Sequence, residues 1–212
     1  QSLPNSVIEQ GSSDSKPDKV LEEVVEVATS TEYVSCEAEL VEHKNFSLCY
    51  AEEHEQASWV SYVLTKSETE GSQKRTNDFR VDPLVSTGSA TKADYKGSGF
   101  DRGHLAPAAD MAFSKEAMSE SFYLSNMSPQ NASFNRGVWK RLESQVREWA
   151  SIEDSVIVIT GSILMEGLEK IPNSKVSIPQ KYFKALFDLT PPYKAIAFVL
   201  DNEGSKKESL VN

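Results

Sequence analysis

The sequence lacks any apolar run that approaches the roughly 18 residues of a membrane-spanning helix, and it contains no internal repeat. It also lacks the G-x-S-x-G elbow of acyl-transfer hydrolases and the glycine-rich P-loop of nucleotide-binding proteins. Hydrophobic residues make up 39% and charged residues 25% of the 212 residues, which is ordinary for a globular protein. These features exclude an integral membrane protein, a collagen, a coiled coil and a wholly disordered chain.

Positive charge is scarce in the N-terminal quarter of the chain. Residues 1–57 hold 13 acidic and 3 basic residues, a balance of −10, which equals the net charge of the whole chain. Residues 58–212 hold 19 acidic and 19 basic residues, a balance of zero. The overall acidity therefore does not argue against a polyanionic partner, because most of the chain is free to form a basic surface.

The same N-terminal region differs from the rest in composition. Residues 1–32 are predicted to form an acidic, flexible tail, because Gly11–Asp18 is small, polar and turn-prone. A short acidic helix is predicted within this tail, over Val20–Ala28. Residues 33–212 are then the folded domain.

Two cysteines, Cys36 and Cys49, lie early in the chain. They could form a disulfide, stay as free thiols, or join His43 and His54 in a zinc site. The spacing of the four residues matches no common zinc pattern, so the sequence favours the first two alternatives. A disulfide would fit a protein outside the cytoplasm.

The pattern of hydrophobic residues predicts four strands and two helices. The strands are Ser58–Thr65, Ser155–Thr160, Lys181–Leu189 and Ala195–Leu200. The helices cover about 114–120 and 135–149, and the second has a buried stripe of Val138, Leu142, Val146 and Trp149. Strands and helices in irregular order, with strands at both ends, predict the α+β class.

The most informative stretch is Gly97–Asp110, which contains the tetrad Asp101-Arg102-Gly103-His104. His104 can act as a base near neutral pH without a large pKa shift. Arg102 is a permanent cation two residues away, and the pair suits attack on an anionic centre such as a phosphodiester. Asp101 could orient its neighbours by hydrogen bonding. Taken alone, the tetrad is also compatible with a structural or solvated histidine in a loop.

The second informative stretch is Phe122–Arg147. On a helix, Asn135, Glu143 and Arg147 fall within about 120° of arc, so they can address one site. An amide oxygen is a suitable hard ligand for Mg²⁺, and an arginine can pair with a phosphate oxygen. The structural alternatives are a helix N-cap for Asn135 and an ordinary ion pair between Glu143 and Arg147.

Taken together, the two stretches resemble the DNA/RNA non-specific endonuclease family. The resemblance spans about residues 45–202. It is carried by Asp101-Arg102-Gly103-His104, Leu105-Ala106-Pro107, Tyr123-Leu124-Ser125-Asn126, Ser128-Pro129-Gln130, Asn135, Gly137, Trp139, Leu142 and Glu143.

This resemblance implies both a fold and an activity. The fold would be a central antiparallel β-sheet flanked by helices, with the site in a ββα-metal motif. The activity would be Mg²⁺-dependent hydrolysis of DNA and RNA, with Mn²⁺ as a substitute metal, giving 5′-phosphate and 3′-hydroxyl ends. Members of the family continue with another strand and helix beyond the region of Asp201, so the C-terminal end is expected to be truncated.

The resemblance also implies roles for six residues. His104 would be the general base, Asn135 the direct Mg²⁺ ligand, Glu143 the partner of a metal-bound water, Asn126 a support for the metal's water shell or for the region of His104, and Arg102 and Arg147 the groups that engage the phosphate.

A further phosphate-binding arginine is expected upstream of the tetrad. Arg75 and Arg80 compete for this place, because the local alignment slips by a residue or two, and we prefer Arg80. Arg136 is another candidate for substrate contact. Cations of this kind bind phosphates without reading the base sequence.

The predicted partners are DNA and RNA of any sequence, and no membrane. A homodimer and a protein inhibitor are left open. The cysteines, the polar leader and the first residue, which is not Met, favour a secreted or periplasmic protein, with a mitochondrial location as the alternative. The alternative function is a nuclease-like module that binds nucleic acid or protein without cutting. Loss of His104 or Asn135 would indicate that alternative, and both residues are present.

Overall fold

The computed structural model describes residues 34–188 and 190–203. The predicted tail over residues 1–32, with its helix over Val20–Ala28, therefore lies outside the described residues, and so does the C-terminal end. Within the described ranges, no helix is long and apolar enough to cross a membrane.

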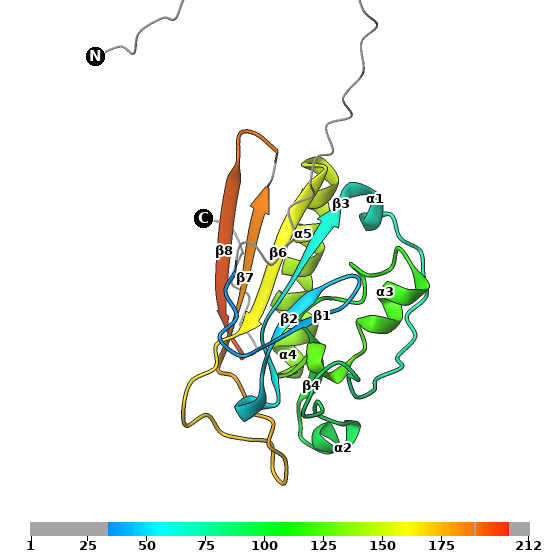
Figure 1. Ribbon diagram of the computed structural model, residues 1–212. Coiled ribbons are helices and arrows are strands. Elements are labelled where there is room, and N and C mark those ends of the chain that lie inside the picture. Colours follow the sequence, from blue (N-terminus) through cyan, green and yellow to red (C-terminus); the bar gives the residue numbers. More distant parts are fainter. Residues whose placement is uncertain (1–33, 189, 204–212) are drawn as a thin grey trace, which may run out of the picture.

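Six antiparallel strands form the main sheet, in the order β1-β2-β3-β6-β7-β8 (Figure 1). Their bounds are Glu39–Glu42 (β1), Ser47–Ala51 (β2), Gln56–Thr65 (β3), Ser155–Ser162 (β6), Lys181–Asp188 (β7) and Lys194–Asp201 (β8). The four strands predicted from the sequence are β3, β6, β7 and β8. The prediction missed β1 and β2, which are short and contain polar residues.

A second, two-stranded sheet pairs β4 (Asp101–His104) with β5 (Met127–Gln130). The tetrad is therefore part of a strand, which excludes the alternative of a histidine in a loop. Strand β4 is held by pairing with a segment about 25 residues further along the chain, which local composition does not reveal.

The helices are short except for one. They are α1 (Lys66–Thr69), α2 (Lys92–Tyr95), α3 (Lys115–Glu120), α4 (Ala132–Phe134) and α5 (Lys140–Ile152), with 3₁₀ turns at Glu52–His54 and Leu124–Asn126. The predicted helix over 114–120 is α3, whose N-cap Ser114 accepts a hydrogen bond from the backbone N–H of Ala117 at 3.0 Å.

The predicted helix over 135–149 is real but not uniform. It begins at α4, widens into a π-helical segment over Asn135–Trp139, and continues as α5. Gly137 has non-helical dihedral angles there, with φ −104° and ψ −106°. A π-helical segment inside an α-helix is often found at a functional site.

The core lies between α5 and one face of the main sheet (Figure 1). The helix contributes the predicted stripe of Val138, Leu142 and Val146, all buried. Trp149 is only partly buried, and it stacks on Phe198 of β8 with ring centroids 6.2 Å apart. This packing confirms the predicted α+β class with a large antiparallel sheet, and it fixes α5 against the sheet.

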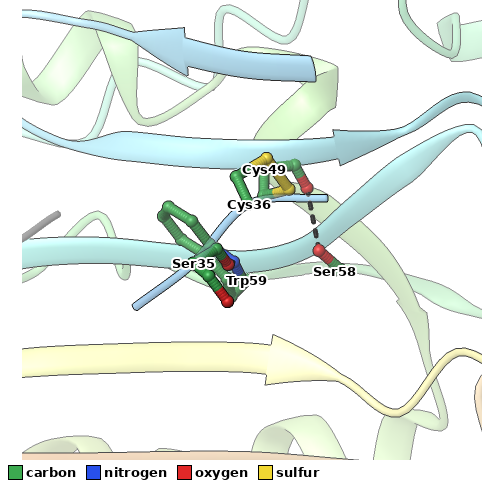
Figure 2. The surroundings of a disulfide bond; sticks show 5 residues. All are labelled: Ser35, Cys36, Cys49, Ser58 and Trp59. Atoms are coloured by element: carbon green, nitrogen blue, oxygen red, sulfur yellow. Dashed lines mark hydrogen bonds between the residues drawn. A yellow bond between two sulfur atoms is a disulfide. The ribbon is translucent and has the colours of Figure 1, made fainter. Parts of the chain in front are cut away.

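The two cysteines form a disulfide, with Cα atoms 5.5 Å apart (Figure 2). Beside it, the indole N–H of Trp59 donates to the carbonyl of Ser35 at 3.0 Å, and the hydroxyl of Ser58 donates to the carbonyl of Cys49 at 3.1 Å. The zinc alternative is therefore wrong, because both thiols are consumed. Its two histidines pair elsewhere, His43 with Asp82 and His54 with Ser177.

Candidate active site

A pocket of about 260 Å³ opens beside β4 and the start of α5. Five of its lining side chains are cationic and one is acidic, so it suits an anionic ligand. The lining residues are Arg75, Arg102, His104, Pro107, Ala108, Ala109, Asn135, Arg136, Lys140, Glu143 and Arg147. The pocket thus brings together most of the residues singled out from the sequence.

Strand β4 supplies Arg102 and His104, which lie two residues apart and so on the same side of the strand. Gly103 between them has no space for a side chain. A Cβ at this position would lie 2.1 Å from Cδ of Gln130, whose buried side chain packs against the strand. Glycine is therefore required for β4 and β5 to pair as closely as they do.

His104 is 8% exposed and sits between aromatic rings. Its ring meets Phe122 edge to face at 5.0 Å and lies 5.9 Å from Phe79. Among the described residues, the buried Nε2 atom has no hydrogen-bond partner. Burial, reinforced by the positive charges of Arg75 and Arg102, lowers the pKa of His104 to about 3. The imidazole is therefore neutral at physiological pH, with a lone pair able to accept a proton.

Asn135 is the first residue of the π-helical segment and faces the tetrad. Its Nδ2 donates to a carboxylate oxygen of Asp101 at 2.9 Å, which leaves Oδ1 as an acceptor. The same carboxylate accepts two hydrogen bonds from Arg136, at 2.6 and 2.8 Å. Asp101 therefore orients its neighbours, as the sequence suggested it could.

Glu143 lies in the first turn of α5 and is the only acidic side chain that lines the pocket among the described residues. Burial raises the pKa of Glu143 to about 7, against the opposing charge of Lys184 and with the added repulsion of Asp110. The pocket holds the carboxyl group of Glu143 and the amide oxygen of Asn135. Both are hard donors of the kind that Mg²⁺ takes, alongside several waters.

Known proteins are similar to this chain in sequence and in fold. The model of the DNA/RNA non-specific endonuclease family matches residues 27–212. This chain belongs to the DNA/RNA non-specific endonuclease family. Human mitochondrial endonuclease G is 37% identical over 161 residues, which cover 70% of this chain and 54% of the human protein. Nuclease C1 of Cunninghamella echinulata var. echinulata is 34% identical over 183 residues, which cover 78% of this chain and 72% of that protein.

The fold is similar as well. A chain in the crystal structure of an EndoG/EndoGI complex matches with a TM-score of 0.73 and 25% identity, covering 81% of this chain and 77% of the other. This chain spans about half the length of the endonuclease G proteins that it matches. In the fold of this family, β4, β5 and the helix that follows form the expected ββα motif.

Of the two arginines upstream of the tetrad, the structure places Arg75 at the pocket and not the preferred Arg80. Arg75 lines the pocket, with its guanidinium carbon 4.8 Å from the ring centroid of Phe122. Arg80 does not line the pocket. It is held by Asp78 at 2.9 Å and by the carbonyl of Ser119 at 2.8 Å, so the geometry does not support the preference for Arg80.

Asn126 does not line the pocket either. It is fully buried, and its amide exchanges two hydrogen bonds with the backbone of Ala106, at 2.8 and 3.0 Å, and donates to the carbonyl of Ser121 at 2.8 Å. Of its two expected roles, this geometry suits support of the backbone that follows His104 and not contact with a metal's water shell.

Arg147 projects from α5 into the pocket. Its Nη1 donates to Asp110 at 2.7 Å, and its Nη2 donates to Ser144 at 3.0 Å. Sequence reasoning gave Asp110 no role, although it ends the stretch that contains the tetrad. Sequence reasoning also missed Phe79 and Phe122, whose rings pack against His104. Their only sequence signal is that they are aromatic residues near charged ones.

Proposed function

We propose that this chain is a Mg²⁺-dependent endonuclease that hydrolyses phosphodiester bonds of DNA and RNA, with His104 as the general base and Mn²⁺ as a substitute metal. The observation that carries the proposal is the partnerless Nε2 of His104 inside a pocket with five cationic side chains, as far as the described residues extend. A neutral base beside fixed positive charges suits attack on an anionic phosphodiester.

The donor atoms present fit the proposed metal. Asn135 would hold Mg²⁺ through Oδ1, because its Nδ2 is committed to Asp101, and Glu143 would accept a hydrogen bond from a bound water. When bound, Mg²⁺ supplies Lewis acidity and stabilises the leaving oxygen.

The protein's own groups then account for the proton and the charge. His104 accepts a proton from the attacking water as the water oxygen bonds to phosphorus. The bond from phosphorus to O3′ breaks, and O3′ leaves with the electron pair and takes a proton from solvent. Arg102 and Arg147 stabilise the negative charge that develops on the phosphate oxygens. The products carry 5′-phosphate and 3′-hydroxyl ends.

The substrate class follows from the same side chains. Arg75, Arg136 and Lys140 add positive charge around the pocket, and such cations contact phosphates and not base edges. Binding is therefore expected to be independent of sequence and to weaken as salt concentration rises.

Digestion of supercoiled plasmid and of a folded RNA tests this function. The purified chain is expected to cut both substrates in Mg²⁺ and in Mn²⁺ and neither in EDTA. The fragments should be ligatable without prior phosphorylation, which requires 5′-phosphate and 3′-hydroxyl ends. A folded chain that binds both nucleic acids in a gel-shift assay but cuts neither would overturn the proposal and favour the non-catalytic module.

We further propose that the protein works in an oxidising compartment, secreted or periplasmic, because its two cysteines are bonded to each other. A mitochondrial location is the alternative, because endonuclease G and EXOG relatives are named mitochondrial. Rapid alkylation of cells followed by mass spectrometry tests the redox state, since an oxidised pair takes up no alkyl group. Protein that is protected from external protease in intact cells but digested in osmotically shocked cells lies in the periplasm. Protein that is protected in both lies in an internal compartment such as the mitochondrion.

The sequence leaves two protein partners open, an inhibitor and a second copy of this chain. A protein inhibitor is proposed by analogy, because the solved EndoG/EndoGI complex is titled for EndoG inhibition. The homodimer, which the sequence leaves open, is tested by sedimentation equilibrium.

A further inference from the structure

Asp110 is a buried carboxylate that joins the main sheet to the pocket. It is 1% exposed, and each of its two oxygens accepts a hydrogen bond. Oδ1 accepts from Nη1 of Arg147 at 2.7 Å, and Oδ2 accepts from the hydroxyl of Tyr62 at 2.6 Å. Tyr62 is itself 1% exposed and lies in the middle of β3, so the carboxylate is anchored to a buried residue of the main sheet.

Arg147 is the group that this anchor holds. Its side chain is 22% exposed, and it lines the pocket with His104 and Asn135. Two of its terminal N–H groups are occupied, by Asp110 and by Ser144, which leaves three of the five guanidinium donors for a ligand. A planar guanidinium held at both terminal nitrogens cannot rotate freely, so the direction of the remaining donors is set before a ligand arrives.

We propose that Asp110 is a positioning residue for Arg147, and that Tyr62 positions Asp110 in turn. The inference rests on the proposed function, because it concerns the direction in which Arg147 meets the phosphate. An arginine loose on a helix surface would still attract phosphate but would have to be ordered during the reaction. An arginine held by a buried carboxylate has already lost that freedom, so its side chain does not have to be ordered as the transition state forms.

A double-mutant cycle in cleavage of a short oligonucleotide tests the link between the two residues. Asp110→Asn preserves the side-chain shape and is expected to lower kcat by about 10-fold to 100-fold, with a much smaller change in KM. In an Arg147→Ala background, Asp110→Asn should change kcat by less than about twofold, because residues that act as a unit are not additive. If the two losses multiply instead, Asp110 does not act through Arg147 and the inference is overturned.

The chain offers a matched control for Tyr62. Tyr50 in β2 is also 1% exposed, and its hydroxyl donates to the carboxylate of Glu55 at 3.0 Å, away from the pocket. Tyr62→Phe is expected to lower kcat about threefold to tenfold, the effect of losing one charge-assisted hydrogen bond, while Tyr50→Phe leaves kcat unchanged. Thermal unfolding should show both variants folded.

Equal kcat values for the two tyrosine variants would overturn the inference even if Asp110→Asn failed to fold. The wild type run in the same assay separates this inference from the proposed function. A wild type that cuts nothing defeats the proposed function, whereas a wild type that cuts, with multiplying losses, defeats only the role of Asp110.

Discussion

Acid should destabilise this protein through His104, and the effect can be worked out from the burial of the ring. The ordinary histidine pKa is 6.5, and burial with two nearby arginines lowers the pKa of His104 in the folded state to about 3. Between these values the unfolded chain binds a proton that the folded chain does not. The free energy of unfolding therefore falls as pH falls through this window.

The expected size of this effect is substantial. One pH unit well inside the window is worth about 1.4 kcal/mol. Because the unfolded histidine is already half protonated at pH 6.5, lowering the pH from 6.5 to 5 should remove about 1.6 kcal/mol through this side chain. Urea unfolding of the wild type and of His104→Gln at both pH values isolates the contribution, because other groups titrate alike in the two proteins. The wild type should lose about 1.6 kcal/mol more than the variant. Equal losses would refute the claim that His104 is held neutral by burial.

Three further predictions concern binding and stability. Arg75→Ala should raise KM several-fold and reduce the salt dependence of binding by about one phosphate contact, whereas Arg80→Ala should do neither; the reverse result would restore the preference drawn from the sequence. Gly103→Ala should lower the free energy of unfolding by about 1–3 kcal/mol, because its methyl group would collide with Gln130, and urea denaturation measures this loss. Reduction of the disulfide, whose cysteines are 13 residues apart, should lower the free energy of unfolding by about 3 kcal/mol, again measured in urea with and without reductant.

Elements with a strong local pattern could be predicted from the sequence. The strands β3, β6 and β7 are long and rich in β-branched or aromatic residues, and α5 carries a regular apolar stripe. The strand β4 could not be predicted, because its sequence DRGH contains three polar residues and a glycine. Its extended form depends on pairing with β5, a contact distant in sequence.

The candidate site also contains residues that the sequence could place and residues that it could not. Spacing placed Asn135, Glu143 and Arg147 on one side of a helix, and the pocket contains all three. Spacing could not choose between Arg75 and Arg80, because the segment between them has no regular structure that would fix their directions.

The burial of His104 was also outside the reach of the sequence. A histidine two residues from an arginine is expected to be solvated, and only the fold shows the aromatic rings that exclude water from it. The lowered pKa of this side chain follows from that packing, which the local sequence does not predict.

Single-turnover cleavage of DNA by His104→Ala, compared with His54→Ala, tests the central claim most directly. His54 is a fair control, because it hydrogen-bonds Ser177 at 2.9 Å and does not line the pocket. Loss of a general base should slow cleavage by roughly 10²-fold to 10⁴-fold for His104→Ala, with the rate of His54→Ala close to that of the wild type. A His104→Ala variant that folds and cuts within about tenfold of the wild-type rate would contradict the role of His104 as the base.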